Sequence, residues 1–260
     1  MRANTHIMRE MKSKKLFNIL KALGAFILLL SVCFSGALFF HTYYYEAIYV
    51  SGNSMSPTLT GGEKEAAGTK VDFGIVDPHQ SALKHIKRFD IVSTYYPDEM
   101  DYDLTTNKLK SDARKKIKRV IALPNETFKI EKGKLFILKD TRFEYVSYTF
   151  KTDPAVEDEY TGKDTVSPIT LKDDEYWVLG DHRSASRDCN SIGKPIKQEN
   201  LYGVLVAIEG TGTLYIKEYV CDYCGNKGKA DGGNVCQRCF SDFRAVYDVK
   251  NKHYHWPKFY

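Results

Sequence analysis

Residues 51–59 read Ser-Gly-Asn-Ser-Met-Ser-Pro-Thr-Leu, which places Ser54 on a turn bracketed by Gly52 and Pro57. Glycine tolerates a positive φ and proline fixes its own φ, so both favour a sharp turn. Upstream lies the uncharged apolar run Ala22–Phe40, which is long enough to cross the hydrocarbon core of a bilayer as one helix. The sequence therefore predicts a serine turn close to a membrane surface.

The flanks of the apolar run predict how the chain is oriented. Against the single acid Glu10, the N-terminal flank carries the basic residues Arg2, Arg9, Lys12, Lys14, Lys15 and Lys21. A basic flank favours the cytoplasmic side, so the rest of the chain is expected outside the cell. The other flank has the aromatic residues of an interfacial anchor, namely Phe39, Phe40, Tyr43, Tyr44 and Tyr45. A cleavable signal peptide ending at Ser35-Gly36-Ala37 is the alternative, but the apolar run continues past that point, which favours a single-span anchor.

The composition favours a mainly β body. The chain has 260 residues with 18 tyrosines and 14 phenylalanines, and its net charge of +5 is too small and too dispersed to indicate nucleic-acid binding. Short patterned segments bounded by turn residues suggest two packed sheets. The expected strands are Tyr44–Val50, Val71–Val76, Asp90–Tyr96, Lys116–Leu123, Phe128–Leu138, Phe143–Phe150, Tyr176–Leu179, Leu201–Ile208 and Thr213–Val220.

Two further blocks accompany the serine turn. Residues 115–124 read Lys-Lys-Ile-Lys-Arg-Val-Ile-Ala-Leu-Pro, and residues 179–188 read Leu-Gly-Asp-His-Arg-Ser-Ala-Ser-Arg-Asp. In order and type the three blocks resemble the type I signal peptidase family, the membrane-bound Ser/Lys proteases that remove signal peptides from exported proteins. The resemblance covers residues 15–210 and implies a two-sheet, signal-peptidase-like catalytic domain.

A serine hydroxyl needs a base before it can attack a carbonyl. A lysine can be that base only when its amine is neutral, which requires burial or neighbouring positive charge. Strand alternation places Lys118 on one face of its segment and Arg119 on the other. Lysine is rarely buried, so Lys118 alone would suggest a basic surface strand. The resemblance matches Ser54 to the family's nucleophile and Lys118 to its general base.

Several neighbouring residues receive supporting roles. Ser51 and Ser56 compete as nucleophile, but the family pattern Gly-x-Ser-Met-x-Pro-Thr selects Ser54. The oxyanion hole is expected at the Ser54 N–H, with Gly52 allowing close approach of the substrate and the second donor unassigned. By resemblance Ser186 orients the lysine, Asp181 pairs with Arg119, and Asp188 is a structural acid. The arginine that usually partners this last acid is Asn190 here, so Arg187 or Arg183 is expected to replace it. Phe89 stands where the family usually has glycine, which predicts a different backbone path there.

The strands that lead to Ser54 and Lys118 are expected to hold an extended peptide by β-addition. The predicted substrate-binding residues are Ala47, Ile48, Tyr49, Val50, Met55, Lys115, Lys116 and Ile117. The resemblance implies small residues, such as alanine, at the first and third positions before the cut. It also implies exported preproteins, membrane lipid and the secretion translocon as partners, and no cofactor for catalysis.

Four cysteines near the C-terminus form two Cys-x-x-Cys pairs, Cys221 with Cys224 and Cys236 with Cys239. Four thiolates suit a tetrahedral zinc ion, so we predict a small zinc ribbon with a structural metal. Disulfides are the alternative, because this segment is expected outside the cell. His253 and His255 are assigned to an aromatic tail, and Cys33 and Cys189 are expected to be free.

These patterns predict four regions. Residues 1–21 are a basic cytoplasmic N-terminus, 22–42 a transmembrane helix, 43–216 the catalytic domain and 217–260 a zinc-ribbon-like segment. The predicted function is a processing endopeptidase of the secretory pathway. Two alternatives are a self-cleaving Ser/Lys regulatory protease, which the membrane anchor disfavours, and a catalytically inactive peptidase-like scaffold, which the intact Ser54 and Lys118 disfavour.

Overall fold

A computed structural model describes residues 2–62, 68–110, 113–147, 165–221, 224–225, 227–228, 236 and 243–260. The chain divides into two compact units, Met1–Glu46 and Ala47–Tyr260. Each unit is described below by itself.

The first unit is dominated by one helix, α1 (Arg2–Tyr43). Its stretch Phe17–His41 has 25 residues with a mean hydropathy of 2.4 and is long and apolar enough to cross a membrane. At its C-terminal end the aromatic rings contact one another, with centroids 4.9 Å apart for Phe39 and Tyr43 and 5.1 Å apart for Tyr44 and Tyr45. The apolar helix expected from the sequence is therefore present, and its length and composition suit a membrane anchor.

The second unit is mainly β, as predicted. Its short helices are α2 (Gln80–Leu83), η1 (Arg183–Ala185), α4 (Cys189–Ile192) and η2 (Gln198–Asn200). Its strands are β1 (Glu46–Tyr49, which begins one residue before the unit), β2 (Lys70–Asp77), β3 (Ile91–Thr94), β4 (Tyr102–Asp103), β5 (Lys108–Leu109), β6 (Lys116–Ala122), β7 (Thr127–Glu131), β8 (Lys134–Lys139), β9 (Arg142–Val146), β10 (Val166–Thr170), β11 (Glu175–Leu179), β12 (Ile196–Lys197), β13 (Leu201–Cys221), β14 (Lys227–Gly228) and β15 (Phe243–Phe259). Within the described ranges these strands form a nine-stranded sheet, a four-stranded sheet and the small β4–β5 hairpin.

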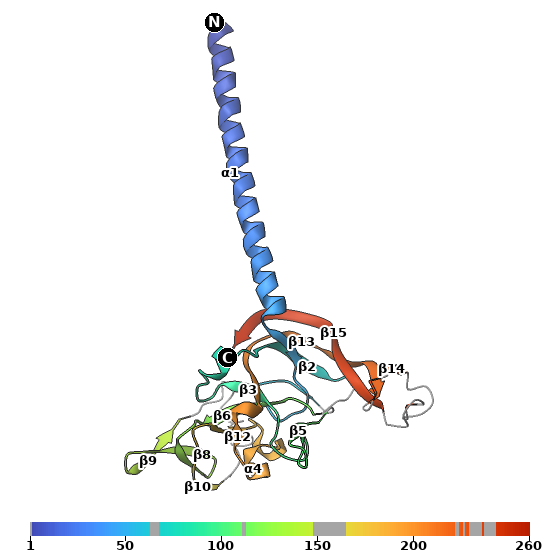
Figure 1. The fold of residues 1–260 in the computed structure, drawn as a ribbon. Coiled ribbons are helices and arrows are strands. Elements are labelled where there is room, and N and C mark those ends of the chain that lie inside the picture. The colour runs from blue at the N-terminus through green and yellow to red at the C-terminus, as the bar shows by residue number, and fades with distance from the viewer. Residues whose placement is uncertain are drawn as a thin grey trace. The chain divides into compact units, whose positions relative to one another are not determined.

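The nine-stranded sheet is organised around β13. The strand order is β1-β2-β13-β3-β6-β11-β12, and β14 and β15 also pair with β13. The sequence predicts two strands, Leu201–Ile208 and Thr213–Val220, but the structure has one strand of 21 residues. The strand continues through Gly210 and Gly212. A Cβ at either position would lie within 2.4 Å of an atom of β15, so only glycine fits there. These glycines allow β13 and β15 to run side by side, as Figure 1 shows.

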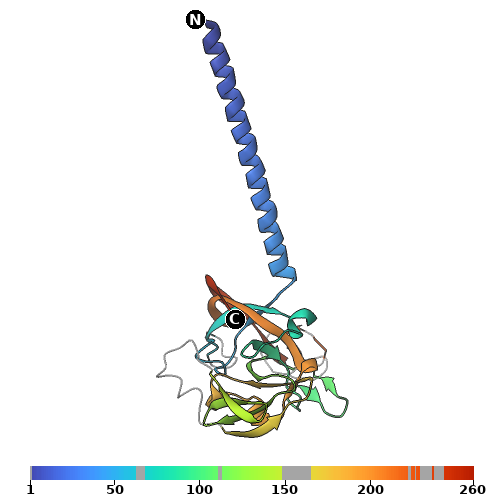
Figure 2. The ribbon, with the colours of Figure 1, turned by 90° about the vertical axis from the view of Figure 1, so that its left-hand side faces the viewer.

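The four-stranded sheet has the order β10-β7-β8-β9. The sequence predicts Phe128–Leu138 as one strand of a hairpin, whereas the structure folds it into two, β7 and β8. Lys132 and Gly133 connect them with φ values of 51° and 76°, the combination of a tight two-residue hairpin turn. In both ribbon views this sheet lies at the opposite side of the unit from the β13–β15 hairpin (Figures 1 and 2).

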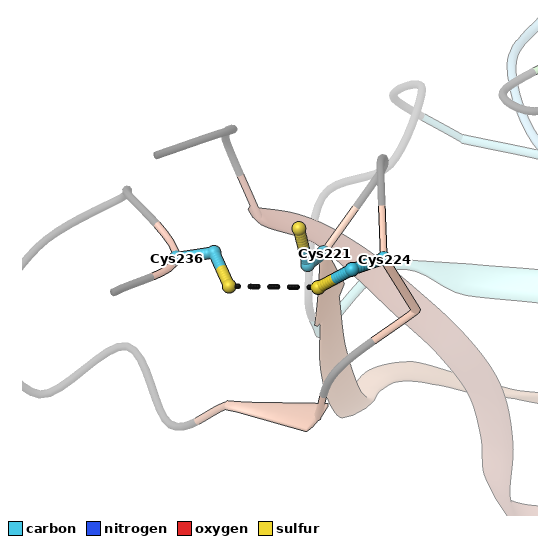
Figure 3. A group of neighbouring side chains, drawn as sticks. All are labelled: Cys221, Cys224 and Cys236. Atoms are coloured by element: carbon cyan, nitrogen blue, oxygen red, sulfur yellow. Dashed lines mark hydrogen bonds between the residues drawn. The ribbon is translucent and has the colours of Figure 1, made fainter. Parts of the chain in front are cut away.

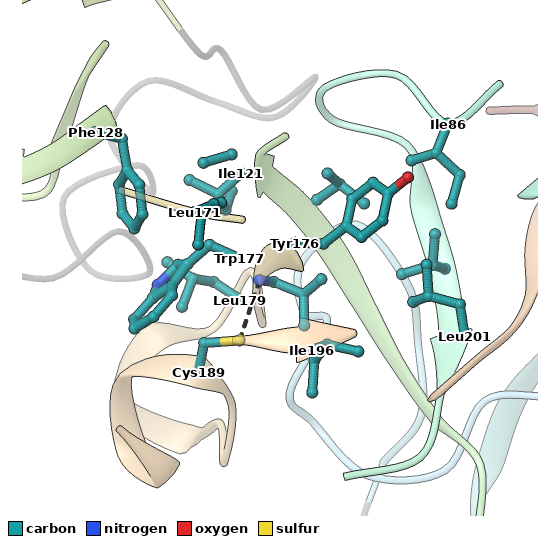
Figure 4. Close-up of a cluster of buried hydrophobic side chains, with 14 of the residues drawn as sticks. Ile86, Ile121, Phe128, Leu171, Tyr176, Trp177, Leu179, Cys189, Ile196 and Leu201 are labelled. Carbon is teal, nitrogen blue, oxygen red and sulfur yellow. Dashed lines mark hydrogen bonds between the residues drawn. The ribbon is translucent and has the colours of Figure 1, made fainter. Parts of the chain in front are cut away.

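Three buried clusters lie in the described part of this unit, and two of them support the site. The larger lies between the sheets, where Ile121 and Trp177 of the large sheet meet Phe128 of the small one (Figure 4). The Cys189 thiol is part of this cluster and accepts a hydrogen bond from the Val178 N–H at 3.3 Å. The second cluster packs beneath the serine turn and contains Val50, Met55, Leu59, Val76, Ile91, Leu205 and Ile208. The serine turn is thus supported by the core of the large sheet.

Candidate active site

The fold brings Ser54 and Lys118 together across 64 positions of sequence. The Lys118 Nζ donates to the Ser54 Oγ at 2.9 Å and to its neighbour's carbonyl, that of Ile117, also at 2.9 Å. Lys118 is only 3% exposed although it lies next to the solvent-facing groove described below. Because burial removes the hydration that stabilises an ammonium ion, this position favours the neutral amine. A neutral amine at hydrogen-bond distance is what serine deprotonation requires.

The conformation of the serine turn is fixed by its backbone. Gly52 has a φ of 83°, the left-handed region that glycine adopts readily, and its N–H donates to the Gly61 carbonyl at 3.2 Å. A Cβ at Gly61 would lie 2.1 Å from the Gly52 oxygen, so the two backbone segments touch. Met55 is buried beneath the turn and also lines the groove.

A buried ion pair connects this turn to the two other blocks. The Arg119 Nε and Nη2 donate to the Asp181 carboxylate at 2.8 and 2.6 Å, which is a bidentate pair. The Thr58 hydroxyl donates to the same carboxylate at 2.6 Å. The expected pairing of Asp181 with Arg119 is therefore present in the structure, and Thr58 adds the serine turn to it. The ion pair orients β6, from which Lys118 projects.

Ser186 makes a different contact from the one expected. Its buried hydroxyl has no hydrogen-bond partner among the described residues, so the predicted hydrogen bond to Lys118 is not formed. The hydroxyl lies next to Gly180 instead. A Cβ at Gly180 would be 2.2 Å from Ser186 Oγ and 2.5 Å from the Ser54 carbonyl oxygen, so a larger residue would not fit. The same carbonyl accepts the His182 N–H at 3.0 Å. The third block thus approaches the serine through backbone contacts, which Gly180 allows.

Asp188 is satisfied by the backbone and not by an arginine. Its carboxylate accepts the N–H groups of Gly180 at 2.9 Å and Asn190 at 3.2 Å, and it caps helix α4. Arg187 pairs with Asp98 at 2.7 Å, and Arg183 donates to the Gly180 carbonyl at 2.9 Å. The expectation that one of these arginines replaces the usual partner of Asp188 is wrong, because backbone amides take that place.

Phe89 adopts a backbone conformation that is unusual for its residue type. Phe89 has a φ of 74°, the left-handed conformation that favours glycine. Its carbonyl accepts the Arg119 Nη1 at 2.8 Å and its N–H donates to Val120 at 2.8 Å. The backbone at Phe89 holds a glycine-like conformation, in which the carbonyl reaches Arg119. The different backbone path expected here stays a prediction.

A groove of about 840 Å³ contains the Ser54–Lys118 pair. All eight residues predicted to bind substrate line it: Ala47, Ile48, Tyr49, Val50, Met55, Lys115, Lys116 and Ile117. The β6–β11 pairing covers Arg119–Ala122, so Lys116–Lys118 extend beyond it, and β1 lies at the end of the large sheet. These strand segments offer backbone groups with which an extended peptide can pair.

Sequence reasoning missed several residues in and beside the groove. Buried Asp101 accepts the Tyr96 N–H at 2.6 Å and pairs with the Lys116 Nζ. No local sequence signal distinguishes Asp101 from the other acids of residues 98–103. The groove is also lined by Ala245, Val246 and Tyr247 of β15, a strand that the sequence did not predict.

Three of the four C-terminal cysteines converge (Figure 3). The sulfurs of Cys221, Cys224 and Cys236 all lie within 4.8 Å of one another, and those of Cys224 and Cys236 are 3.7 Å apart. A disulfide would bring two sulfurs to about 2.0 Å. Four thiolates bound tetrahedrally to zinc at about 2.3 Å lie about 3.8 Å apart, which fits the shorter observed separation. Cys239 lies outside the described residues.

This chain is similar to known proteins of one family. The family model "Signal peptidase, peptidase S26" matches residues 19–208. A "Signal peptidase I" of Streptococcus pneumoniae serotype 4 is 29% identical over 208 residues, which cover 68% of this chain and 86% of that protein. "Signal peptidase I V" of Bacillus subtilis strain 168 is 30% identical over 159 residues, covering 60% and 80%. A crystal structure of a signal peptidase I from Enterococcus faecalis V583 is 25% identical and covers 46% of this chain and 96% of that one, with a TM-score of 0.33.

The family match covers residues 19–208, which include most of the apolar helix. It also covers the serine turn, Lys118 and the Asp181 block, which meet in the second unit. This chain is a serine peptidase and belongs to the signal peptidase family, peptidase S26.

Proposed function

We propose that this chain is a membrane-anchored endopeptidase that removes signal peptides from exported preproteins, with Ser54 as nucleophile and Lys118 as general base. Signal peptide removal is supported by the family match and by the relatives. The assignment of the two residues rests on one observation, the 2.9 Å contact between a buried lysine amine and the Ser54 hydroxyl.

The reaction then proceeds in two acyl-transfer steps. The neutral Lys118 amine accepts the Ser54 proton while Oγ attacks the scissile carbonyl carbon. The Ser54 N–H donates to no backbone carbonyl of the described residues, so we assign it to stabilise the oxyanion. The Lys118 ammonium donates its proton to the departing amine, which leaves an acyl-enzyme and a neutral lysine. The departing amine is the N-terminus of the mature protein. Lys118 next deprotonates a water that attacks the ester, and Ser54 regains its proton as the signal peptide leaves with a new C-terminal carboxylate.

The substrate is held as an extended strand between β1 and the start of β6. Ala47–Val50 and Lys115–Ile117 supply its backbone partners, and alternate side chains of the peptide enter the groove. We expect small residues at the first and third positions before the cut.

The membrane placement gives this groove access to its substrates. The basic residues before Phe17 favour a cytoplasmic N-terminus, which puts the catalytic unit on the outer side of the membrane. Translocated preproteins present their cleavage sites there, beside their apolar segments. Membrane lipid and the secretion translocon are the further partners that this location implies.

The cysteine cluster holds a structural zinc ion in this proposal. Cys221, Cys224 and Cys236 provide three thiolates, and Cys239 is assigned as the fourth. A site filled by four thiolates leaves no open coordination position, so catalysis itself uses no metal.

The test compares cleavage of a preprotein by the purified full chain and its variants. Wild type should cut once, after a small residue, whereas Ser54→Ala and Lys118→Ala should not. Ser81→Ala in α2 and Lys84→Ala directly after it change exposed residues, so they are the matched controls and should cut like wild type. Equal processing by Ser54→Ala would refute the assignment, and binding of the preprotein without cleavage by wild type would favour the scaffold alternative.

A further inference from the structure

One wall of the groove comes from a part of the chain beyond the family match. The match ends at residue 208, whereas Ala245, Val246 and Tyr247 of β15 line the same groove as Ser54 and Lys118. The groove therefore has the catalytic pair of the family and a wall that residues 19–208 do not supply.

The pairing of β15 with β13 explains how this wall is placed. Tyr247 pairs with Ile216 and Val246 pairs with Glu218, so the register shifts by one residue at Lys217. Such a bulge increases strand twist and re-aims the side chains beside it. In a regular strand alternate residues face opposite sides, whereas here three consecutive residues of β15 reach the groove. The bulge lies where β15 passes the groove.

Tyr247 meets the substrate-binding strand at this point. Tyr247 and Tyr49 both pack against the buried cluster of Val71, Phe73, Leu214 and Val249. The pKa of Tyr49 is raised, first by burial, and its charged and titratable neighbours are Arg114, Tyr247 and Asp248. Strand β1, strand β15 and the segment before β6 thus converge on Tyr49. The two tyrosines form an apolar, aromatic part of the groove.

We propose that Tyr247, flanked by Ala245 and Val246, is a specificity-determining residue that contacts apolar side chains of the substrate upstream of the cut. The inference rests on the proposed function. Tyr49 precedes Ser54 by five positions. A peptide paired along β1 therefore places residues several positions from the scissile bond beside Tyr49 and Tyr247. In a signal peptide the residues upstream of the cleavage site belong to the apolar segment, whose side chains suit an aromatic wall.

The experiment uses two synthetic peptides with the same cleavage site. The long peptide keeps its upstream apolar segment, and the short peptide ends before it. For Tyr247→Ala we expect KM for the long peptide to rise about tenfold with kcat unchanged, because an aromatic contact of this size is lost. The short peptide should be cut with the same KM and kcat by both enzymes.

Two further variants separate a contact from a structural role. Tyr247→Phe keeps the ring and should retain the wild-type KM for the long peptide. Trp256→Ala, on the same strand but 89% exposed and outside the groove lining, should do the same. An unchanged KM in Tyr247→Ala, or an equal rise for the long and short peptides, would overturn the inference. Failure of the proposed function itself would look different, since Ser54→Ala would then still cut both peptides.

Discussion

Replacing Asp181 by asparagine should destabilise the catalytic unit more than any exposed ion-pair change. The Asp181 side chain is 1% exposed and its partner Arg119 is 8% exposed. At the observed separation of 2.6 Å, an effective dielectric constant of about 20 gives an attraction of about 6 kcal/mol. Asparagine keeps the shape but removes the charge, which leaves the Arg119 guanidinium buried without its counter-charge. We expect the free energy of unfolding to fall by about 3–5 kcal/mol, because part of the attraction already offsets the desolvation of both groups.

The measurement is urea unfolding of the full chain in detergent, followed by circular dichroism at a wavelength that reports β structure. Glu144→Gln is the matched control, since it also converts a carboxylate into an amide. Glu144 pairs with Lys139 at 3.2 Å and Arg142 at 3.4 Å, but these side chains are 63% and 81% exposed. The control should therefore cost less than about 1 kcal/mol.

The Asp181→Asn change should also reduce activity under conditions where the variant stays folded. The carboxylate holds Thr58 of the serine turn and Arg119 next to Lys118, so its loss should loosen the 2.9 Å contact between Lys118 and Ser54. A loss of stability no larger than that of Glu144→Gln, together with full activity, would refute the role given to this ion pair.

Three further predictions concern the serine turn, the base and the cysteine cluster. Gly180→Ala places a Cβ 2.5 Å from the Ser54 carbonyl oxygen, so it should lower kcat and cost about 1–3 kcal/mol of stability in cleavage and unfolding assays. In the control Gly36→Ala the new Cβ meets nothing within 4 Å, so neither quantity should change. Activity should fall on acidification, by about tenfold per pH unit, once the Lys118 amine is protonated and can no longer accept a proton from Ser54. The same fall in kcat at saturating peptide would support Lys118 as general base. A cleavage rate that does not change with pH would contradict this role. A strong chelator should remove the zinc, as measured by elemental analysis. Its removal should raise KM, because the cysteines close the hairpin that carries Tyr247, while an acylating inhibitor should still label Ser54. Absence of zinc from the purified protein would favour the disulfide alternative.

The pairing of Ser54 with Lys118 was implied by the resemblance to the family, because Lys118 alone suggests a basic surface strand and 64 positions separate the two residues. Gly52 and Pro57 mark the turn, and the apolar neighbours of Lys118 mark a strand that can bury an amine. The pairing of Arg119 with Asp181 followed from the same resemblance. These features are encoded in short segments whose local chemistry has few alternatives.

Other features depend on contacts that no short segment encodes. Strand β15 has Asn251 at a φ of 52° and Pro257 near its end, so the segment resembles an irregular tail until β13 provides an edge for it. Gly210 and Gly212 suggest a break in the sequence, whereas in the fold they are the positions of closest approach between two strands. Phe89 shows the same dependence, because the surrounding hydrogen bonds impose a backbone conformation that its side chain disfavours.

The pairing of β13 has a practical consequence for anyone who shortens this protein. From Ala207 to Cys221 one edge of β13 is covered by β15. A chain trimmed after residue 221 would keep every residue that the family model matches, yet it would expose a long row of unpaired amide and carbonyl groups beside the substrate groove. Such an edge invites other strands to add to it, so the trimmed enzyme should self-associate or capture its own peptide substrates out of register.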